Sequence, residues 1–323
     1  MYKLGGIVLT DTGKKIDGLR RRSNILEVGL YALLYHRYPG IVEQMDLCYD
    51  PGGRRTSLDI IRPMDSGDSP KPLLIYIHGG GWVSGLRKAR RFYCRRWAHQ
   101  GFVCANIGYD YALDAKHPEH IRQIFRGIEY VLRRSGEFGI DPSRVAVAGE
   151  SAGGYFAALL SAVTSHPQLY NLLDIKFGFK DSFRIQASVL ISGIFDPVRA
   201  LDTGFPDMPL FVEAFAGRPP AELRGEGDGL RSSLAPSYYT DEKFPPAFII
   251  GSDKDRLLPE SIALHQELDC AGVKNELYIC KGVNGVHAGG LACHIGSGKK
   301  AVERAVRFVE SQIGCEKDAV EAG

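Results

Sequence analysis

The chain has almost no net charge and no long uncharged apolar run. Its 40 lysines and arginines are balanced by 38 aspartates and glutamates, which leaves a formal charge of +2. No whole-molecule field therefore draws the protein to nucleic acid or to an anionic membrane. The apolar segment at residues 24–38 contains Glu27 and is shorter than the about 20 residues that a membrane span needs. We expect an amphipathic docking helix there, and neither nucleic acid nor a membrane as a partner.

Signals for secretion and for metal binding are also missing. The segment MYKLGGIVLT at the start has no charged region followed by a long apolar stretch, so we expect no signal peptide. The cysteines form no C-x-x-C pair, the histidines form no H-E-x-x-H, and the glycine-lysine segments at 6–15 and 295–300 are not P-loops. We therefore expect reduced thiols, a cytoplasmic protein, no metal and no cofactor. The seven cysteines are Cys48, Cys94, Cys104, Cys270, Cys280, Cys293 and Cys315.

Charge is concentrated in one place, the segment RKARRFYCRR at residues 87–96. We interpret it as the solvated face of a helix. A site for an acidic ligand is the alternative. Its basic residues are Arg87, Lys88, Arg90, Arg91, Arg95 and Arg96.

Short apolar segments alternate with longer amphipathic ones along the chain. Several of the apolar segments lack polar alternation, which is typical of parallel strands covered on both faces. Amphipathic segments such as residues 118–139 are typical of crossover helices. The pattern predicts the α/β class, with a mostly parallel central sheet flanked by helices. The expected strands are residues 57–62, 73–78, 102–107, 144–149, 185–191, 246–251 and 276–280.

Residues 196–246 interrupt this alternation with a high density of proline and with the glycines of RGEGDG. Such a segment is a poor crossover and favours an excursion over one end of the sheet, where excursions often cover a binding site. We expect one domain over residues 1–323, with residues 1–43 as an N-terminal cap or docking segment and residues 196–246 as a cap-like insertion. Two domains are the alternative that the chain length leaves open.

The segment RVAVAGESAGGYFAALL, residues 144–160, joins a predicted strand to a predicted helix through a serine flanked by glycines. Its G-x-S-x-G pattern stands in the strand-turn-helix context in which a serine nucleophile lies on a strained turn. The glycines let strand and helix approach, and the helix N-terminus at Ser151 presents N–H groups to developing negative charge. Taken alone, the pattern fits a structural turn serine equally well.

A second glycine-rich turn follows another apolar strand. In the segment HGGGW, His78 is followed by three consecutive glycines. Consecutive glycines weaken regular structure, so we expect the backbone itself to have a function here. That function would be to aim the N–H groups of Gly80 and Gly81, together with that of Ala152, at an oxyanion. We expect His78 to brace this loop rather than to act as a base.

Together, HGGGW and GESAGG resemble the α/β-hydrolase fold, specifically its hormone-sensitive-lipase-like carboxylesterase branch. The resemblance spans residues 44–313 and implies a cofactor-free serine esterase whose catalytic residues follow the order Ser, Asp, His. The chain departs from the family at IGYDYALDAKHPEH, where similar enzymes have a Y-R-L-x-P-E segment, and at Gln123, which is often aspartate in relatives. These departures leave the subfamily and the substrate open.

The family order points to the acid and the base. Asp255 is followed by an apolar pair and a proline, as the family pattern has it, and Asp253 is the alternative. His287 lies in a glycine-rich loop after the last predicted strand, and the family order favours it over His294. Ser151 would then attack the substrate, His287 would transfer the proton and Asp255 would fix the imidazole.

Aromatic side chains are candidates for an acyl or alcohol pocket, with core packing as the alternative. We place Trp82, Phe195, Phe211 and Tyr238 in the pocket, and Phe205, Phe215 and Tyr239 are further candidates.

The sequence therefore predicts a serine hydrolase that cleaves small carboxylic esters, with a short acyl group such as acetyl, through an acyl-enzyme. An arylformamidase or an amide or peptide hydrolase on the same scaffold is an alternative. A non-catalytic binding protein is the alternative of another class, although the serine or the histidine would be expected to be missing from it. The oligomeric state is open, a homo-oligomer included.

Overall fold

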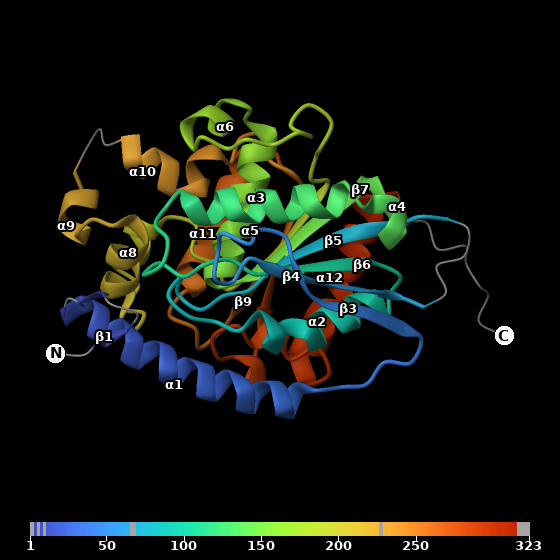
Figure 1. Ribbon diagram of the computed structural model, residues 1–323, viewed down its shortest axis with the longest axis horizontal. Helices are drawn as coiled ribbons and strands as arrows, with labels where there is room; N and C mark the ends of the chain where they lie inside the picture. Colours follow the sequence, from blue (N-terminus) through green and yellow to red (C-terminus); the bar gives the residue numbers. More distant parts are fainter. Residues whose placement is uncertain (1–2, 5–6, 9–10, 65–68, 226–228, 315–323) are drawn as a thin grey trace.

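The computed structural model describes residues 3–4, 7–8, 11–64, 69–225 and 229–314. An eight-stranded sheet lies at its centre (Figure 1), in the order β10-β9-β8-β7-β5-β6-β4-β3. Pairing is parallel from β10 to β6 and antiparallel where β4 pairs with β6 and β3. The strands are β3 (Ile41–Cys48), β4 (Ser57–Pro63), β5 (Lys71–Ile77), β6 (Val103–Ile107), β7 (Ile140–Glu150), β8 (Ala187–Ile191), β9 (Ala247–Ser252) and β10 (Asn275–Cys280), and β1 (Lys3–Leu4) pairs separately with β2 (Ile7–Val8).

Helices connect the strands and cover both faces of the sheet. The longer helices are α1 (Asp11–Leu34), α2 (Arg91–Ala98), α3 (Glu119–Leu132), α5 (Ala152–Ser165), α8 (Met208–Ala216), α11 (Leu258–Cys270) and α12 (Gly296–Gln312). The shorter ones are α4 (Ser135–Phe138), α6 (Gln168–Leu172), α7 (Pro197–Ala200), α9 (Pro220–Leu223), α10 (Gly229–Leu234), η1 (Arg87–Arg90), η2 (Pro236–Tyr239), η3 (Gly282–Asn284) and η4 (Gly289–Leu291).

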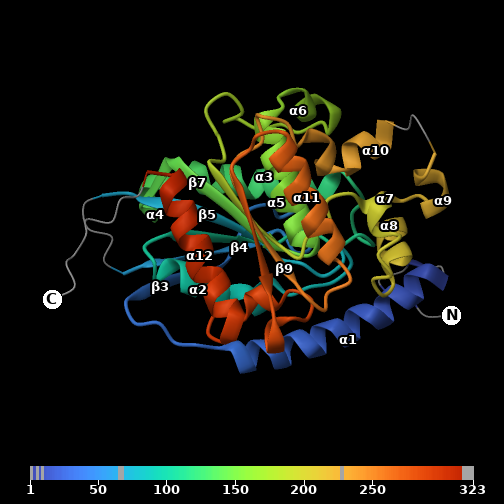
Figure 2. The ribbon, with the colours of Figure 1, turned by 180° about the vertical axis from the view of Figure 1, so that it is seen from behind.

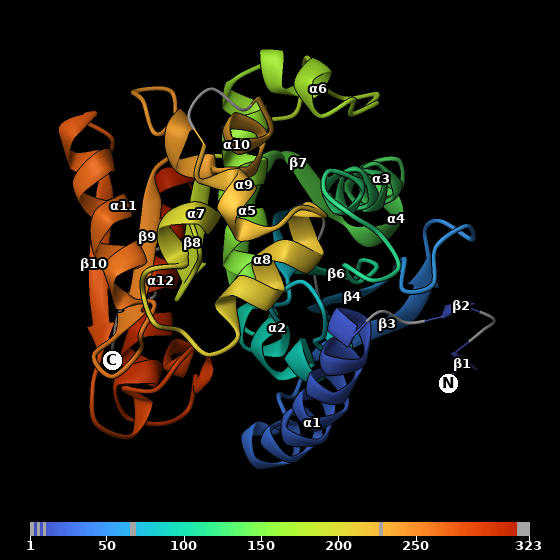
Figure 3. The ribbon, with the colours of Figure 1, turned by 90° about the vertical axis from the view of Figure 1, so that its left-hand side faces the viewer.

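The sheet separates two hydrophobic cores because successive side chains of a strand point to opposite faces. In β5, Leu73, Ile75 and Ile77 join the core that contains residues of α3, α5 and α11. Leu74 and Tyr76 join the core that contains residues of α2 and α12. Figure 3 shows α3 and α2 on opposite sides of the strands. Burial on both faces explains why the central strands are apolar throughout rather than alternating.

The predicted α/β architecture is confirmed, and each of the seven expected strands overlaps a strand of the sheet. The expected helix at 118–139 is divided into α3 and α4. The edge strand β3 was not predicted, because Glu43, Gln44 and Asp46 give it a polar composition and its side chains are only partly buried.

The two segments expected to cap the sheet form helices near one another. The docking helix expected at 24–38 is α1, which begins earlier and contacts η1 and α8. Figure 2 shows α1 running beneath the sheet toward α8. The proline-rich segment contains α7, α8, α9, α10 and η2 instead of a single crossover helix. Residues 1–2, 5–6 and 9–10 of the first segment and 226–228 of the second lie outside the described residues, as does Cys315.

The basic segment at residues 87–96 is not a solvated helix face, and that prediction is wrong. Arg87 is buried and pairs with Asp46 at 2.5 Å, while Arg91 pairs with Asp59 at 2.8 Å. Lys88 alone in the segment is exposed. Carboxylates of the chain itself thus pair with five of the six basic residues, namely Arg87, Lys88, Arg90, Arg91 and Arg95.

The six cysteines within the described ranges are free thiols, and Cys94, Cys104, Cys280 and Cys293 are buried. Across the same ranges, none of the helices combines the length and the apolar character that crossing a bilayer requires.

Candidate active site

Ser151 lies on a strained turn between β7 and α5. Its backbone has φ 54° and ψ −121°, a conformation that residues with a side chain rarely adopt. The turn is held by the Ser151 N–H, which donates to the Ile191 carbonyl at 2.8 Å. A Cβ at Gly149 would lie 2.3 Å from the Gly153 oxygen, and one at Gly153 would lie 2.1 Å from the Ile77 oxygen. Only glycine therefore fits two positions before and two positions after this serine.

His287 and Asp255 complete a hydrogen-bonded chain to Ser151. Asp255 follows β9, and His287 lies in the loop after β10. The His287 Nε2 atom is 3.0 Å from the Ser151 Oγ, and its Nδ1 is 2.8 Å from an Asp255 carboxylate oxygen. Since β7, β9 and β10 are parallel, their carboxyl ends meet at one edge of the sheet. The topology therefore brings together three residues that are far apart in the sequence.

The Asp255 carboxylate is kept ionised by its partners. Its side chain is 1 % exposed, and burial alone would raise its pKa. Hydrogen bonding and charge attraction from His287, with the N–H of Leu257 donating at 3.0 Å, lower the pKa below its usual value instead. Asp255 is thus fixed as a hydrogen-bond acceptor for the imidazole.

The alternative acid and base lie elsewhere. Asp253 is exposed, and its backbone N–H donates to the Cys280 carbonyl. His294 lies against Tyr38, whose hydroxyl is 3.2 Å from its Nε2, and against the ring of His36. Neither residue is hydrogen-bonded to the Ser151–His287 pair.

The loop after β5 presents backbone N–H groups next to Ser151. Gly80 has φ 123°, and a Cβ there would lie 2.2 Å from the Ser84 carbonyl oxygen. Among the described residues, no acceptor pairs with the N–H groups of Gly80, Gly81 or Ala152. His78 is buried beneath this loop and stacks on the Tyr109 ring at 4.6 Å. Burial lowers the His78 pKa to about 4, so this imidazole is neutral at pH 7, and its Nδ1 lies 2.8 Å from the Gly79 carbonyl oxygen in the loop.

A buried charge network connects the turn at Ser151 with the loop after β5. This network was not predicted from the sequence. Glu150 accepts from the Gly79 N–H at 2.7 Å and from Arg90 Nε at 2.6 Å. The other side of Arg90 pairs with Glu27 of α1 at 3.2 Å. Burial alone would lower the pKa of Arg90, but the Glu150 and Glu27 carboxylates raise it. The network therefore joins the turn before Ser151, the loop after β5 and helix α1.

We expect Glu150→Gln to destabilise the fold by about 3–5 kcal/mol, because it removes one partner of a buried ion pair. The change keeps one acceptor oxygen for Gly79 and Arg90, but it removes the charge and puts an NH₂ group where a carboxylate oxygen accepts from the Tyr76 hydroxyl. The measurement is the free energy of unfolding in urea. Glu129→Gln is the control, because Glu129 pairs with the exposed Arg133 one helical turn away. Equal small losses in both variants would contradict the assigned role of Glu150.

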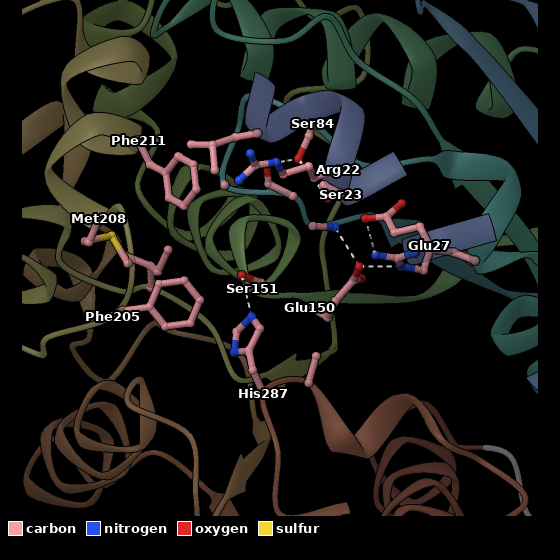
Figure 4. A pocket seen from close by; sticks show the side chains of 17 residues that line it. Arg22, Ser23, Glu27, Ser84, Glu150, Ser151, Phe205, Met208, Phe211 and His287 are labelled. Atoms are coloured by element: carbon pink, nitrogen blue, oxygen red, sulfur yellow. Dashed lines mark hydrogen bonds and ion pairs between the residues drawn. The ribbon is translucent and has the colours of Figure 1, made fainter. Parts of the chain in front are cut away.

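A cavity of about 390 Å³ opens above Ser151 (Figure 4). Phe205 packs its ring 4.8 Å from that of His287 and lines this cavity together with Met208. The full lining is Leu19, Arg22, Ser23, Glu27, Gly79, Gly80, Gly81, Ser84, Arg90, Glu150, Ser151, Ile194, Phe205, Met208, Phe211, His287 and Ala288. Within the described ranges, no group of three or more His, Cys, Asp and Glu side chains could hold a metal ion.

Three of the four aromatic residues placed in the pocket do not line this cavity. Trp82 is fully buried and stacks on Phe215 at 4.5 Å, and Phe195 is fully buried as well. Tyr238 is half exposed and has Arg231 over its ring. Of the four, Phe211 lines the cavity, and so does the further candidate Phe205. The cavity residues contributed by α1 were not predicted, since nothing in the sequence indicates which face of that helix turns to the site.

Comparison with known proteins places this architecture among esterases. The family model BD-FAE matches residues 58–268. Esterase LipQ of Mycobacterium tuberculosis is 29% identical over 90% of this chain and 67% of its own length. LipM of the same organism, which is named a probable carboxylic ester hydrolase, is 28% identical over 66% of this chain, and this chain spans only about half (48%) of LipM.

Solved structures show the same fold. Esterase B of Lactobacillus rhamnosis superposes with a TM-score of 0.82 at 20% identity, over 94% of this chain and 95% of that one. The same esterase B was also solved inhibited by a tributyrin phosphonate, with a TM-score of 0.81. The chain therefore belongs to the BD-FAE family and has the α/β-hydrolase fold of its esterase relatives.

Proposed function

We propose that Ser151, His287 and Asp255 form a catalytic triad with which this carboxylic ester hydrolase cleaves small esters. The observation that supports the proposal is the continuous chain of hydrogen bonds, 3.0 Å from serine to imidazole and 2.8 Å from imidazole to carboxylate. A serine hydroxyl is a weak nucleophile at neutral pH and needs such an adjacent base.

The geometry supports a two-step reaction. His287 Nε2 removes the Ser151 proton as Oγ attacks the ester carbonyl, and it then donates that proton to the leaving alcohol. Asp255 holds the imidazole with Nδ1–H directed at its carboxylate and stabilises the imidazolium. In the second step, His287 deprotonates a water molecule, which hydrolyses the acyl-enzyme and regenerates Ser151.

The oxyanion of each tetrahedral intermediate would be bound by the N–H groups of Gly80, Gly81 and Ala152. These N–H groups have no hydrogen-bond acceptor among the described residues. Ala152 is the first residue of α5, directly after Ser151, and Gly80 and Gly81 lie in the loop after β5. One such donor is worth about 10²–10³-fold in turnover in enzymes of this kind.

We also propose that residues 1–323 form one domain, in which α1 and the segment at 196–246 cap the site. Both segments contribute side chains to the cavity, Arg22 from α1 and Phe211 from α8 among them. The buried free thiols support a reducing compartment, and we propose the cytoplasm.

A rate series across p-nitrophenyl esters from acetate to decanoate tests the acyl preference. We expect kcat/KM to fall by at least about tenfold beyond butyrate, because a longer apolar chain would press on Phe211 and Met208 or reach the charged side chains of α1. Phe211→Ala should move the optimum to longer chains. A rate that rises steadily to decanoate would contradict a short acyl pocket.

The same assay with two additional substrates, N-formylkynurenine and a p-nitroanilide, separates the other candidate functions. N-formylkynurenine turned over faster than every ester would favour an arylformamidase, and a matched p-nitroanilide turned over faster would favour an amidase. Binding of the esters without any turnover would favour a non-catalytic binding protein.

A further inference from the structure

The wall of the cavity has two chemically different sides. One side is apolar and belongs to the segment that follows β8, with Ile194, Phe205, Met208 and Phe211. The other side belongs to α1, with Leu19, Arg22, Ser23 and Glu27. Figure 4 shows Arg22 and Ser23 across Ser151 from His287. A substrate in this cavity therefore meets charge on the side opposite the imidazole.

Most of the charges at the cavity are already paired. Glu27 and Glu150 both pair with Arg90. Arg22 differs, since no carboxylate of the described residues lies within 4.0 Å of it. Arg22 is exposed, and it lines the cavity as a positive charge without a carboxylate partner among the described residues.

The two preceding arginines of α1 have other roles. Arg20 donates from Nε to the Val83 carbonyl at 2.9 Å, and Arg21 pairs with Asp17 at 2.8 Å. Neither of them lines the cavity. Three consecutive arginines thus point to three different surroundings, and Arg22 is the one directed to the active site.

We propose that Arg22 binds a carboxylate at the far end of the acyl group, so that the preferred substrates are monoesters of dicarboxylic acids. The proposal rests on the proposed function. The leaving oxygen must face His287, which returns the proton to it, so the acyl group is the part that extends away from His287. A guanidinium presents paired N–H donors that match a carboxylate.

The test compares monoethyl glutarate with ethyl glutaramate, its uncharged amide of nearly equal size, by chromatography of the acids released. Wild-type kcat/KM should be about fivefold higher for the carboxylate, which corresponds to about 1 kcal/mol, as for a partly exposed ion pair. The difference should lie mainly in KM and should shrink in 1 M salt, where the Debye length is about 3 Å.

Matched variants assign the preference to one side chain. Arg22→Gln should reduce the ratio of the two kcat/KM values to about one, and Arg22→Glu should invert it. Arg21→Gln removes the same charge from the neighbouring position outside the cavity and should leave the ratio unchanged.

Three outcomes would overturn the proposal. Equal wild-type rates on the two glutarate esters, or equal loss of preference in Arg21→Gln and Arg22→Gln, would contradict a role for Arg22 while leaving ester hydrolysis intact. No Ser151-dependent hydrolysis of ethyl glutaramate, together with none of p-nitrophenyl acetate, would contradict the proposed function itself and this inference with it.

Discussion

Ser151→Ala is expected to lower kcat toward p-nitrophenyl acetate by about 10⁶-fold while the protein stays folded. The loss is large because the variant retains the imidazole, the carboxylate and the N–H groups but has no atom to form the acyl-enzyme. The residual rate comes from direct hydrolysis of the ester by a water molecule, which the retained imidazole and N–H groups still assist. The fold should persist, because alanine keeps the Cβ and the small size that the turn requires, and the backbone N–H still donates to Ile191.

Active-site labelling gives an independent measurement of the same prediction. A p-nitrophenyl alkylphosphonate should add once to the wild-type protein, on the peptide that contains Ser151, and should not add to Ser151→Ala. Ser161→Ala is the matched control, since Ser161 lies in α5, the helix that follows Ser151, is buried and donates its hydroxyl to the Ala157 carbonyl at 2.9 Å. Full activity in Ser151→Ala, or labelling of a different residue, would refute the assignment of the nucleophile.

The turn around Ser151 could be predicted because its requirements are local. The strand, the serine and the helix are contiguous, and the close approaches at Gly149 and Gly153 can be met only by glycine. The positions of Asp255 and His287 needed the family order as well, because their contact depends on parallel strands whose ends meet at one sheet edge.

The cavity was predicted less well, because aromatic side chains look alike in a sequence whether they pack in the core or line a site. Trp82 directly follows the three glycines of the loop after β5, yet its side chain lies in the core and stacks on Phe215. Arg90 was interpreted as part of a solvated face, although it is buried between Glu150 and Glu27. Such pairings join residues from separate elements, and no local pattern encodes them.

Asp255→Asn is expected to lower kcat by about 10⁴-fold. An asparagine can direct its NH₂ group at His287 Nδ1, which stabilises the tautomer that carries the proton on Nε2 and cannot accept one from Ser151. Asp253→Asn is the matched control and should stay within about twofold of wild type, because Asp253 is exposed and uses its backbone, not its carboxylate, to bond Cys280. Equal losses of kcat in the two variants would show that the Asp255 carboxylate contributes no more to catalysis than the exposed Asp253 carboxylate.

The pH dependence of stability distinguishes a charged partner from a structural one. Because the pKa of Asp255 is lower in the folded protein than in the unfolded chain, its ionised form stabilises the fold above the unfolded pKa of about 4. That contribution is lost as the pH falls through the folded pKa. The difference in unfolding free energy between wild type and Asp255→Asn should therefore be largest near neutral pH and should shrink below about pH 4. A difference that stays constant down to pH 3 would mean that Asp255 acts through packing, whereas the triad requires it to act through its charge.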